Sequence, residues 1–426
     1  MTNGKSNGKS GGKSDGKIVF WPSKRHAFDL RLLLLVLAMV VFGLIMVYSS
    51  SFIFAQEKIG NGFAFIQKQL IFAILGFTVL GLAARTDYHL WSSKAYPVLI
   101  LAALLLVLVF IPGVGHKVGG AHRWIRLGNW RFQPGELAKF AIIFFVARQL
   151  DLHLGLLRTQ WRKVLVHFFI PLPLFFLLLF QPDFGTEVIM SIVIFFMFFA
   201  AGVRFRYLLS ALIPVLMTGL WLALGSEYRR ARLMTYLDPW RDPGGKGFQI
   251  LQSFVGLHNG GLFGVGLGNG REKLFYLPEA HNDFIFSVIG EELGFVGVFV
   301  LVLAYLYFMY RGLRIAWIAQ RENQDRFGMF LATGITLALS LQGFVNIAVV
   351  LGLLPTKGLA LPFISYGGSA LVVDLFAVGV LLNVGRGNHL KWSRGSLPPG
   401  AGIFKAPQAI CNVNTTNWST DKGHRG

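Results

Sequence analysis

The sequence is poor in charged residues and in cysteine. Only 14% of its 426 residues are charged, whereas 54% are hydrophobic. A soluble domain carries about 25% charged residues, which excludes an ordinary water-soluble globular protein. The one cysteine, Cys411, lies in a polar C-terminal segment, so no intrachain disulfide can form. The sequence also lacks a His/Cys cluster with zinc spacing and a Ser-His-Asp arrangement with a nucleophile elbow.

Acidic residues are half as numerous as basic ones. The 20 Asp and Glu against 40 Lys and Arg give a net charge of +20. Such an excess is typical of a membrane protein whose cytoplasmic segments contact anionic lipid headgroups. The N-terminal residues repeat Gly-Lys-Ser, which indicates a basic low-complexity tail. A phosphate-binding loop is not expected there, because Ile18 stands where Ser or Thr is required.

Long apolar runs fill most of the remaining chain. A membrane-spanning helix needs about 20 mostly apolar residues, and helices of this kind satisfy every backbone polar group internally. We therefore predict an all-α polytopic membrane protein with about ten transmembrane helices. The predicted spans are 31–52, 69–84, 96–112, 136–152, 163–180, 185–203, 207–225, 284–310, 328–351 and 368–385.

The Lys and Arg distribution predicts the orientation of these spans. Both tails and the short even-numbered loops are basic, and positive charge favours the cytoplasmic side. We expect a cytoplasmic tail at 1–30, a membrane domain at 31–385 and a second cytoplasmic tail at 386–426. The membrane domain includes a large extracytoplasmic loop, 226–283, between spans seven and eight.

Two outer loops, 113–135 and 226–283, are basic despite their side of the membrane. A long loop can cross regardless of its charge, or these loops hold an anionic ligand. Both contain many Gly and aromatic residues, and we expect them to form short helices at the membrane interface.

One group of polar residues precedes and enters the eighth span. Residues 277–286 read LPEAHNDFIF and contain Glu279, His281 and Asp283. Asp283 stands where the helix should begin, so it could be a helix N-cap, a proton acceptor at a cavity mouth, or both. Glu291 and Glu292 lie about 12 Å deeper and must face the bundle interior or a water-filled cavity.

A second group lies around the start of the fourth span, in residues 120–139. Glu136 and Lys139 share one helix face and could form an ion pair. Alternatively, Arg123, Arg131 and Lys139 form a cationic funnel for a phosphate or pyrophosphate.

Two further groups lie on the outward side. In the turn 181–187, Asp183 and Glu187 fit a helix cap and a first-turn acid better than catalytic residues. The loop 352–369 contains Lys357 and Ser365, and its Gly and Pro residues either punctuate helices or expose backbone amides to a ligand. In the ninth span, Gln342 and Asn346 are expected to form interhelical hydrogen bonds rather than ligand contacts.

These motifs together closely resemble the SEDS family of shape, elongation, division and sporulation proteins. The resemblance rests on LPEAHNDFIFSVIGEELGFVG (277–297), HRWIRLGNWRFQPGELAK (122–139), residues 181–186 and PTKGLALPFISYGGS (355–369). It extends from the first predicted span to the tenth. The Thr-Lys-Gly of 356–358 is typical of division members, whereas elongation members typically have Val-Thr-Gly.

The resemblance implies a peptidoglycan glycosyltransferase that polymerises lipid II at the outer face of the cytoplasmic membrane, at the division septum. It implies that Asp283 is the catalytic carboxylate and that the remaining site residues bind substrate: Arg123, Arg131, Lys139, Glu136, Glu279, His281, Lys357 and Ser365. It also implies a class B penicillin-binding protein and other division proteins as partners. A divalent cation such as Mg²⁺ or Mn²⁺ could assist, although no residue pattern specifies one.

Three alternatives remain open at this point. A lipid II flippase would use similar charges, but we find no inverted repeat, and the charged groups concentrate on one side. A scaffold that only recruits an enzyme would have little use for Asp283 and Lys139, which are costly in a membrane. An elongation-type polymerase differs from a division-type one at only a few positions.

Overall fold

The fold was obtained as a computed structural model. The structure describes residues 28–118, 121–128, 130–169, 171–181, 183–225, 234–245, 247–277, 280–356 and 358–387. These residues all belong to one compact unit. Most of the two predicted tails, and the candidate site residues Glu279 and Lys357, lie outside the described residues.

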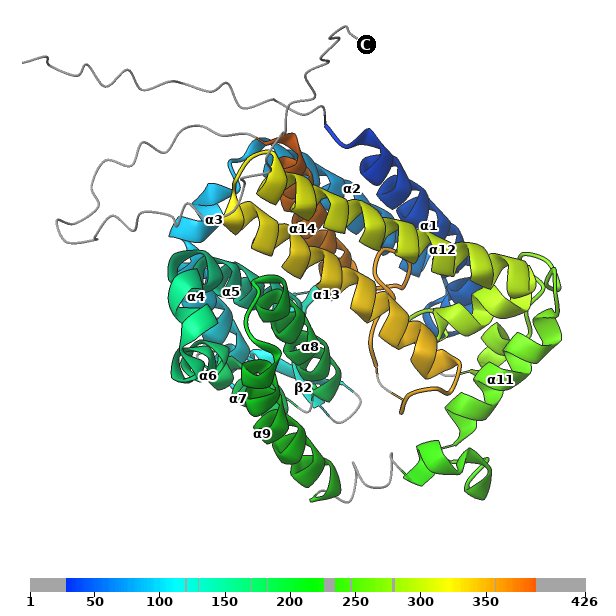
Figure 1. The fold of residues 1–426 in the computed structure, drawn as a ribbon. Coiled ribbons are helices and arrows are strands. Elements are labelled where there is room, and N and C mark those ends of the chain that lie inside the picture. The colour runs from blue at the N-terminus through cyan, green and yellow to red at the C-terminus, as the bar shows by residue number, and fades with distance from the viewer. Residues whose placement is uncertain are drawn as a thin grey trace, which may run out of the picture. The chain divides into compact units, whose positions relative to one another are not determined.

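Helices make up most of the described chain (Figure 1). Those of the first half are α1 (Leu30–Ile59), α2 (Ala64–Arg85), α3 (His89–Ser93), α4 (Ala95–Leu108), α5 (Pro134–Thr159), α6 (Trp161–Phe169), α7 (Leu172–Phe180), α8 (Phe184–Ala200) and α9 (Phe205–Leu224). Those of the second half are η1 (Pro239–Arg241), α11 (Phe248–Gly260), η2 (Glu272–Tyr276), α12 (Ile285–Arg321), α13 (Arg326–Val350) and α14 (Gly368–Arg386).

Every predicted span coincides with helix. In chain order the spans correspond to α1, α2, α4, α5, the pair α6–α7, α8, α9, α12, α13 and α14. Among the described residues, six helices are long and apolar enough to cross a membrane, and α6–α7 is a seventh candidate. The prediction of an all-α polytopic membrane fold is confirmed. The predicted span 163–180 corresponds to the pair α6–α7, which is bent by 41° at a break next to Pro171.

Two helix starts show how local sequence sets the boundaries. Asp29 caps α1 by accepting a hydrogen bond from the Leu32 amide at 3.1 Å. Asp325 caps α13 in the same way, with the Gly328 amide at 3.1 Å. Carboxylates favour this position because they satisfy amides that have no partner inside the helix.

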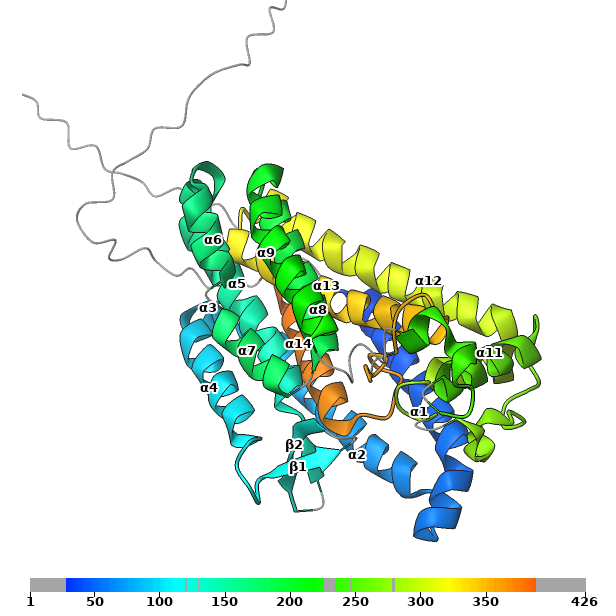
Figure 2. The ribbon, with the colours of Figure 1, turned by 90° about the horizontal axis from the view of Figure 1, so that it is seen from below.

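The centre of the bundle is formed by α5, α13 and α14, which bury most of their residues, whereas α1, α2 and α12 leave most of theirs exposed. Figures 1 and 2 show α12 and α13 running side by side, with α11 next to the end where α12 begins. The exposed residues of the outer helices are large and apolar, as expected of a surface that faces lipid.

The prediction of interfacial helices in the outer loop 113–135 is wrong. This segment forms an antiparallel sheet of three strands, β1 (Gly115–Val118), β2 (Ala121–Leu127) and β3 (Trp130–Phe132). In its register Ile125 pairs with Phe132 and Arg126 with Arg131. Gly128, with a φ of 63°, forms the tight turn between β2 and β3, and closely spaced turns leave no length for a helix. In loop 226–283 the expected short helices are present as η1, α11 and η2.

The eighth span is interrupted. Inside α12, Gly294 has a φ of 65° and a ψ of −165°, which break the regular helix. Only glycine adopts such a conformation without strain. Residues 261–266 pack against the break and supply the backbone hydrogen bonds that the helix loses there.

Candidate active site

Asp283 lies in the turn that leads into α12, and its side chain is half-buried. The helix N-cap is Phe284, so Asp283 does not cap the helix as the sequence suggested. The reason is that the chain makes an additional turn at 281–284 before the helix begins at Ile285. The carboxylate instead faces the loop after α13, where a Cβ added to Gly358 would lie 2.7 Å from Asp283 Oδ2. The absence of a side chain at residue 358 therefore makes room for the carboxylate.

Two side chains of α13 hold this arrangement together. Asn346 Nδ2 donates to the carbonyl of Asp283 at 2.8 Å and to that of Leu359 at 2.6 Å. One turn earlier, Gln342 Nε2 donates to the carbonyl of Ala360 at 2.9 Å, and Gln342 Oε1 accepts a hydrogen bond from Lys139 on α5. These amides thus connect the segment of Asp283, the loop between α13 and α14 (called the outer loop below) and α5.

Glu136 and Lys139 form the ion pair that their spacing predicted. Lys139 Nζ lies 2.6 Å from Glu136 Oε2, and both side chains are buried. Because Lys139 is 2% exposed, its ammonium does not reach an open surface in this structure. A buried ammonium needs such partners, since an unpaired charge inside the bundle is very costly.

Asp374 on α14 was not predicted as a site residue. It is 1% exposed, and its Oδ1 atom has no hydrogen-bond partner in the described structure. It lies close enough to Lys139 to interact electrostatically. A lone Asp inside an apolar span is itself a signal of a functional site. Asp374 therefore joins Glu136 as a second acid beside Lys139.

The two arginines lie above this pair, on the small sheet. Arg123, on β2, donates through Nε to the carbonyl of Gln181 at 3.0 Å, and Arg131, on β3, is exposed. Burial raises the pKa of Tyr366 and the charge of Arg131 opposes that shift, which places Arg131 near Tyr366. Tyr366 also contacts His281, with ring centroids 5.8 Å apart. The sheet thus brings Arg131 towards the segment that carries Asp283.

His281 and Ser365 lie inside the packing. His281 is 8% exposed, and its ring lies 4.7 Å from that of Phe65, measured between centroids. Ser365 Oγ donates to the carbonyl of Asn282 at 2.6 Å and accepts from the Leu361 amide at 2.8 Å. In this structure Ser365 ties the outer loop to the residue before Asp283.

In the turn 181–187, Asp183 occupies the N-cap position of α8 as predicted, but its side chain does not bond a helix amide; its Oδ2 atom accepts a hydrogen bond from Thr186 Oγ1 at 2.9 Å instead. Glu187 lies in the first turn of the helix. Within the described residues, no group of three or more His, Cys, Asp or Glu is arranged to hold a metal ion.

Comparison with known proteins agrees with the arrangement of these motifs. The family model described as "Cell cycle protein", which covers FtsW, RodA and SpoVE, matches residues 30–390. The chain belongs to this family. The resemblance to SEDS proteins found in the motifs is thereby confirmed.

Members of the FtsW/RodA/SpoVE family are similar to this chain over most of its length. A relative from Geobacter sulfurreducens, named probable peptidoglycan glycosyltransferase FtsW, is 48% identical over 357 residues, which cover 84% of this chain and 95% of the relative. One chain of known structure is 32% identical to this chain, with a TM-score of 0.69, and the match covers 84% of this chain and 98% of the other. Its structure is described as "Structural coordination of polymerization and crosslinking by a peptidoglycan synthase complex". RodA of Thermus thermophilus is 29% identical, with a TM-score of 0.62, and covers 84% and 97%. The chain is thus a multi-pass membrane glycosyltransferase of this family.

Proposed function

We propose that this chain polymerises lipid II into glycan strands and that Asp283 is the general base. A base must reach the acceptor hydroxyl and remain accessible to substrate. Two features support this role: the carboxylate of Asp283 is half-buried and so remains accessible, and Asn346 holds the main chain of Asp283. This half-buried carboxylate, beside the loop between α13 and α14 at the start of a span, is the observation that carries the proposal.

In the proposed reaction, Asp283 accepts the proton of the acceptor sugar hydroxyl. The hydroxyl oxygen attacks the anomeric carbon of the donor, and undecaprenyl pyrophosphate leaves with the bonding electrons. Arg131 and Arg123 stabilise the negative charge of the leaving group, since fixed cations often supply a large part of catalysis. Lys139 lies deeper and, with Glu136 and Gln342, fixes α5 against the outer loop.

The cellular setting is part of the same proposal. We place both termini in the cytoplasm and Asp283 on the outer side, in accordance with the Lys and Arg distribution. The chain acts in cell division with a class B penicillin-binding protein, which crosslinks the strands. Support comes from the FtsW relative and from a solved relative that belongs to a peptidoglycan synthase complex.

The test is polymerisation of purified lipid II by the reconstituted chain with its penicillin-binding partner. We expect glycan strands from the wild type and none from Asp283→Ala that remains folded and partner-bound. Asp87→Ala is the matched control, because Asp87 is also a half-buried carboxylate, accepts a hydrogen bond from the His89 amide, and lies in the loop after α2. Strand formation by Asp283→Ala at the wild-type rate would refute the role of Asp283. Transport of lipid II without polymerisation would refute the reaction itself.

A further inference from the structure

The loop between α11 and η2 exposes a dense group of apolar side chains. Leu262, Phe263, Val265 and Leu267 are 66%, 81%, 40% and 56% exposed. They follow one another within seven residues, in a segment that would be expected to face water as part of an extracytoplasmic loop. Apolar surface of this kind marks a site of contact with a protein or a membrane.

The break in α12 provides hydrogen-bond partners for the backbone of the segment 261–267. The amides of Val265 and Gly266 donate to the carbonyls of Glu291 and Glu292, both at 3.0 Å. The carbonyl of Gly261 accepts from the Phe295 amide at 2.9 Å, and that of Leu262 from the next amide at 3.1 Å. Non-helical backbone is tolerated at membrane depth only where protein satisfies its polar groups, and this segment meets that condition.

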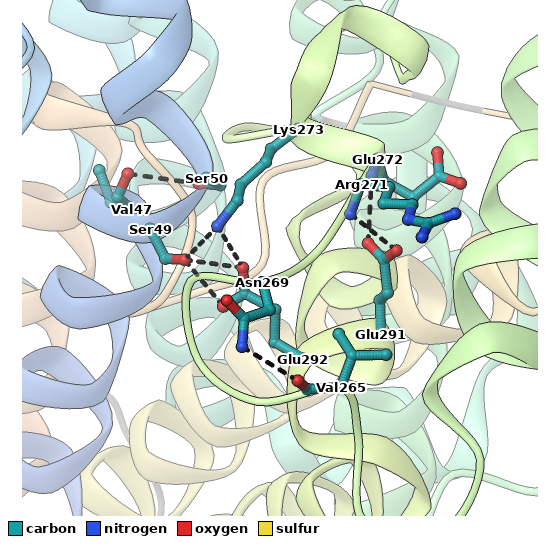
Figure 3. Close-up of polar contacts among 10 residues, drawn as sticks. All are labelled: Val47, Ser49, Ser50, Val265, Asn269, Arg271, Glu272, Lys273, Glu291 and Glu292. Atoms are coloured by element: carbon teal, nitrogen blue, oxygen red, sulfur yellow. Dashed lines mark hydrogen bonds and ion pairs between the residues drawn. The ribbon is translucent and has the colours of Figure 1, made fainter.

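Buried charged side chains hold the chain in place where it enters η2 (Figure 3). Lys273 Nζ lies 2.7 Å from Glu292 Oε1, and Ser49 Oγ on α1 donates to the same carboxylate at 2.8 Å. Glu291 accepts the backbone amides of residues 271 and 272 at 2.8 and 3.1 Å. Residues 271–273 are thereby held against α1 and α12, and residues 261–266 against α12, so the height of the loop along α12 is defined.

Two pairs of polar contacts between α1 and α12, which we call charged layers, indicate where the loop lies relative to the bilayer. Near the start of α1, Asp29 Oδ2 lies 2.6 Å from Nη2 of Arg311, ten residues before the end of α12. Further along α1, Ser49 meets Glu292 of α12. In both helices roughly 20 residues separate these two layers, which corresponds to about 30 Å, the thickness of the hydrocarbon core. We infer from this match that the two layers lie at the edges of the apolar part of the membrane.

The tip of the segment lies inside these bounds. Gly261 and Leu262 bond to α12 at the level of Phe295 and the residue after it, three to four residues beyond Glu292. That distance corresponds to about 5 Å below the charged layer, the depth at which interfacial segments bury their apolar side chains. Exposed Phe295 and Phe299 of α12, at 59% and 51%, continue the same apolar surface.

We propose that residues 261–264, the tip of this segment, insert into the bilayer leaflet on the side of Asp283, with Leu262 and Phe263 among the lipid acyl chains. The large loop between α9 and α12 is then anchored in the membrane through this tip. The occupant of the surface is lipid, because the tip lies within the hydrocarbon bounds and is continuous with the exposed face of α12. This inference does not depend on the proposed reaction.

Spin-label accessibility in lipid vesicles tests the insertion. The full chain with Cys411→Ser provides a cysteine-free background, since Cys411 is its only cysteine. Phe263→Cys is labelled with a nitroxide after reconstitution into vesicles of phosphatidylethanolamine and phosphatidylglycerol. Phe299→Cys serves as the lipid control, and Lys58→Cys, at the exposed end of α1, as the aqueous control. Collision rates are measured with oxygen, which concentrates in acyl chains, and with a water-soluble nickel complex.

We expect the ratio of oxygen to nickel collisions at position 263 to match that at 299 and to exceed that at 58. A ratio equal to that at 58 would overturn the proposal, because the tip would then lie in water. Low collision rates with both reagents would also overturn it, because protein, such as a second copy, would cover the tip. Leu262→Cys, at a side chain that is 66% exposed, provides the same measurement if Phe263→Cys does not elute as a monodisperse protein.

Discussion

Asn346 provides the most direct test of how the candidate site is held together. Alanine at this position removes the donor from the carbonyls of Asp283 and Leu359, which lie 2.8 and 2.6 Å from Nδ2. A buried polar group left without a partner costs about 1–3 kcal/mol. We expect this cost for the buried carbonyl of Leu359 and a smaller cost for the carbonyl of Asp283, whose hydrogen bond is only partly buried. The freed Asp283 segment can shift, and a displacement of about 1 Å can lower a rate by about 10²-fold.

Asn383→Ala is the matched control for this prediction. Asn383 is also fully buried, donates to the carbonyl of Ala84 at 2.8 Å and accepts from the Tyr88 amide at 3.0 Å, but it lies far along α14 from the outer loop. Both variants should lose similar thermal stability. Only Asn346→Ala should lower kcat for lipid II polymerisation per folded molecule, with little change in KM. Equal kcat losses in the two variants, or none in Asn346→Ala, would refute the reasoning.

Three further predictions concern the same region. Gly358→Ala would place a Cβ 2.7 Å from Asp283 Oδ2, whereas in the control Gly367→Ala the nearest atom to the new Cβ would be 3.6 Å away. We expect the polymerisation rate to fall about tenfold or more in Gly358→Ala and little in Gly367→Ala. Similar rates in the two variants would contradict this prediction. Lys273→Met should cost about 3–5 kcal/mol of stability by leaving the buried Glu292 without its counter-ion, and adding Glu292→Leu should recover most of it in a double-mutant cycle of thermal unfolding. Burial, followed by the charge of Glu291, raises the pKa of Glu272 to about 7. A carboxyl group whose pKa is raised in the folded state does not reduce stability below its pKa in the unfolded chain, but reduces it as the pH rises through its pKa in the folded protein. Glu272→Gln should therefore raise the melting temperature at about pH 8 and not at about pH 5. Equal shifts of the melting temperature at both pH values would contradict this prediction.

The spans were predictable because their signal is local. A run of about 20 apolar residues needs little else to become a helix in lipid. Breaks inside the runs were not predicted, because they depend on contacts from elsewhere in the chain. Gly294 reads as an ordinary small residue until residues 261–266 are placed beside it and take over its helical hydrogen bonds. The sheet at 115–132 is not predictable from composition, because its Gly and aromatic residues fit interfacial helices as well as short strands joined by tight turns.

The candidate site was predictable to the extent that its residues are neighbours in sequence. Glu136 and Lys139 are one helical turn apart, and the structure shows their ion pair. Asn346 and Asp283 are separated by 63 residues, and the sequence predicted an interhelical bond for Asn346, whereas its amide bonds the turn before α12 and the loop after α13. The role of Asp374 is not evident from the sequence, because a single acid in an apolar run has no neighbouring residue that reveals its partner.

The depth of each charge explains why these groups can serve different roles. Asp283 precedes α12 and lies about two turns beyond the charged layer of Glu292, outside the hydrocarbon bounds, where a carboxylate keeps contact with water. Lys139 lies inside the packing of α5, where it is stabilised by Glu136 and Gln342. The pyrophosphate of a lipid-linked substrate stays at headgroup level, because its lipid tail is confined to the bilayer. The substrate therefore meets Asp283 and the exposed Arg131 first, and the buried pair acts by fixing α5 and the outer loop beneath them. Neutralising Arg131 should consequently weaken substrate binding, whereas breaking the Glu136–Lys139 pair should destabilise the protein as well as slow the reaction.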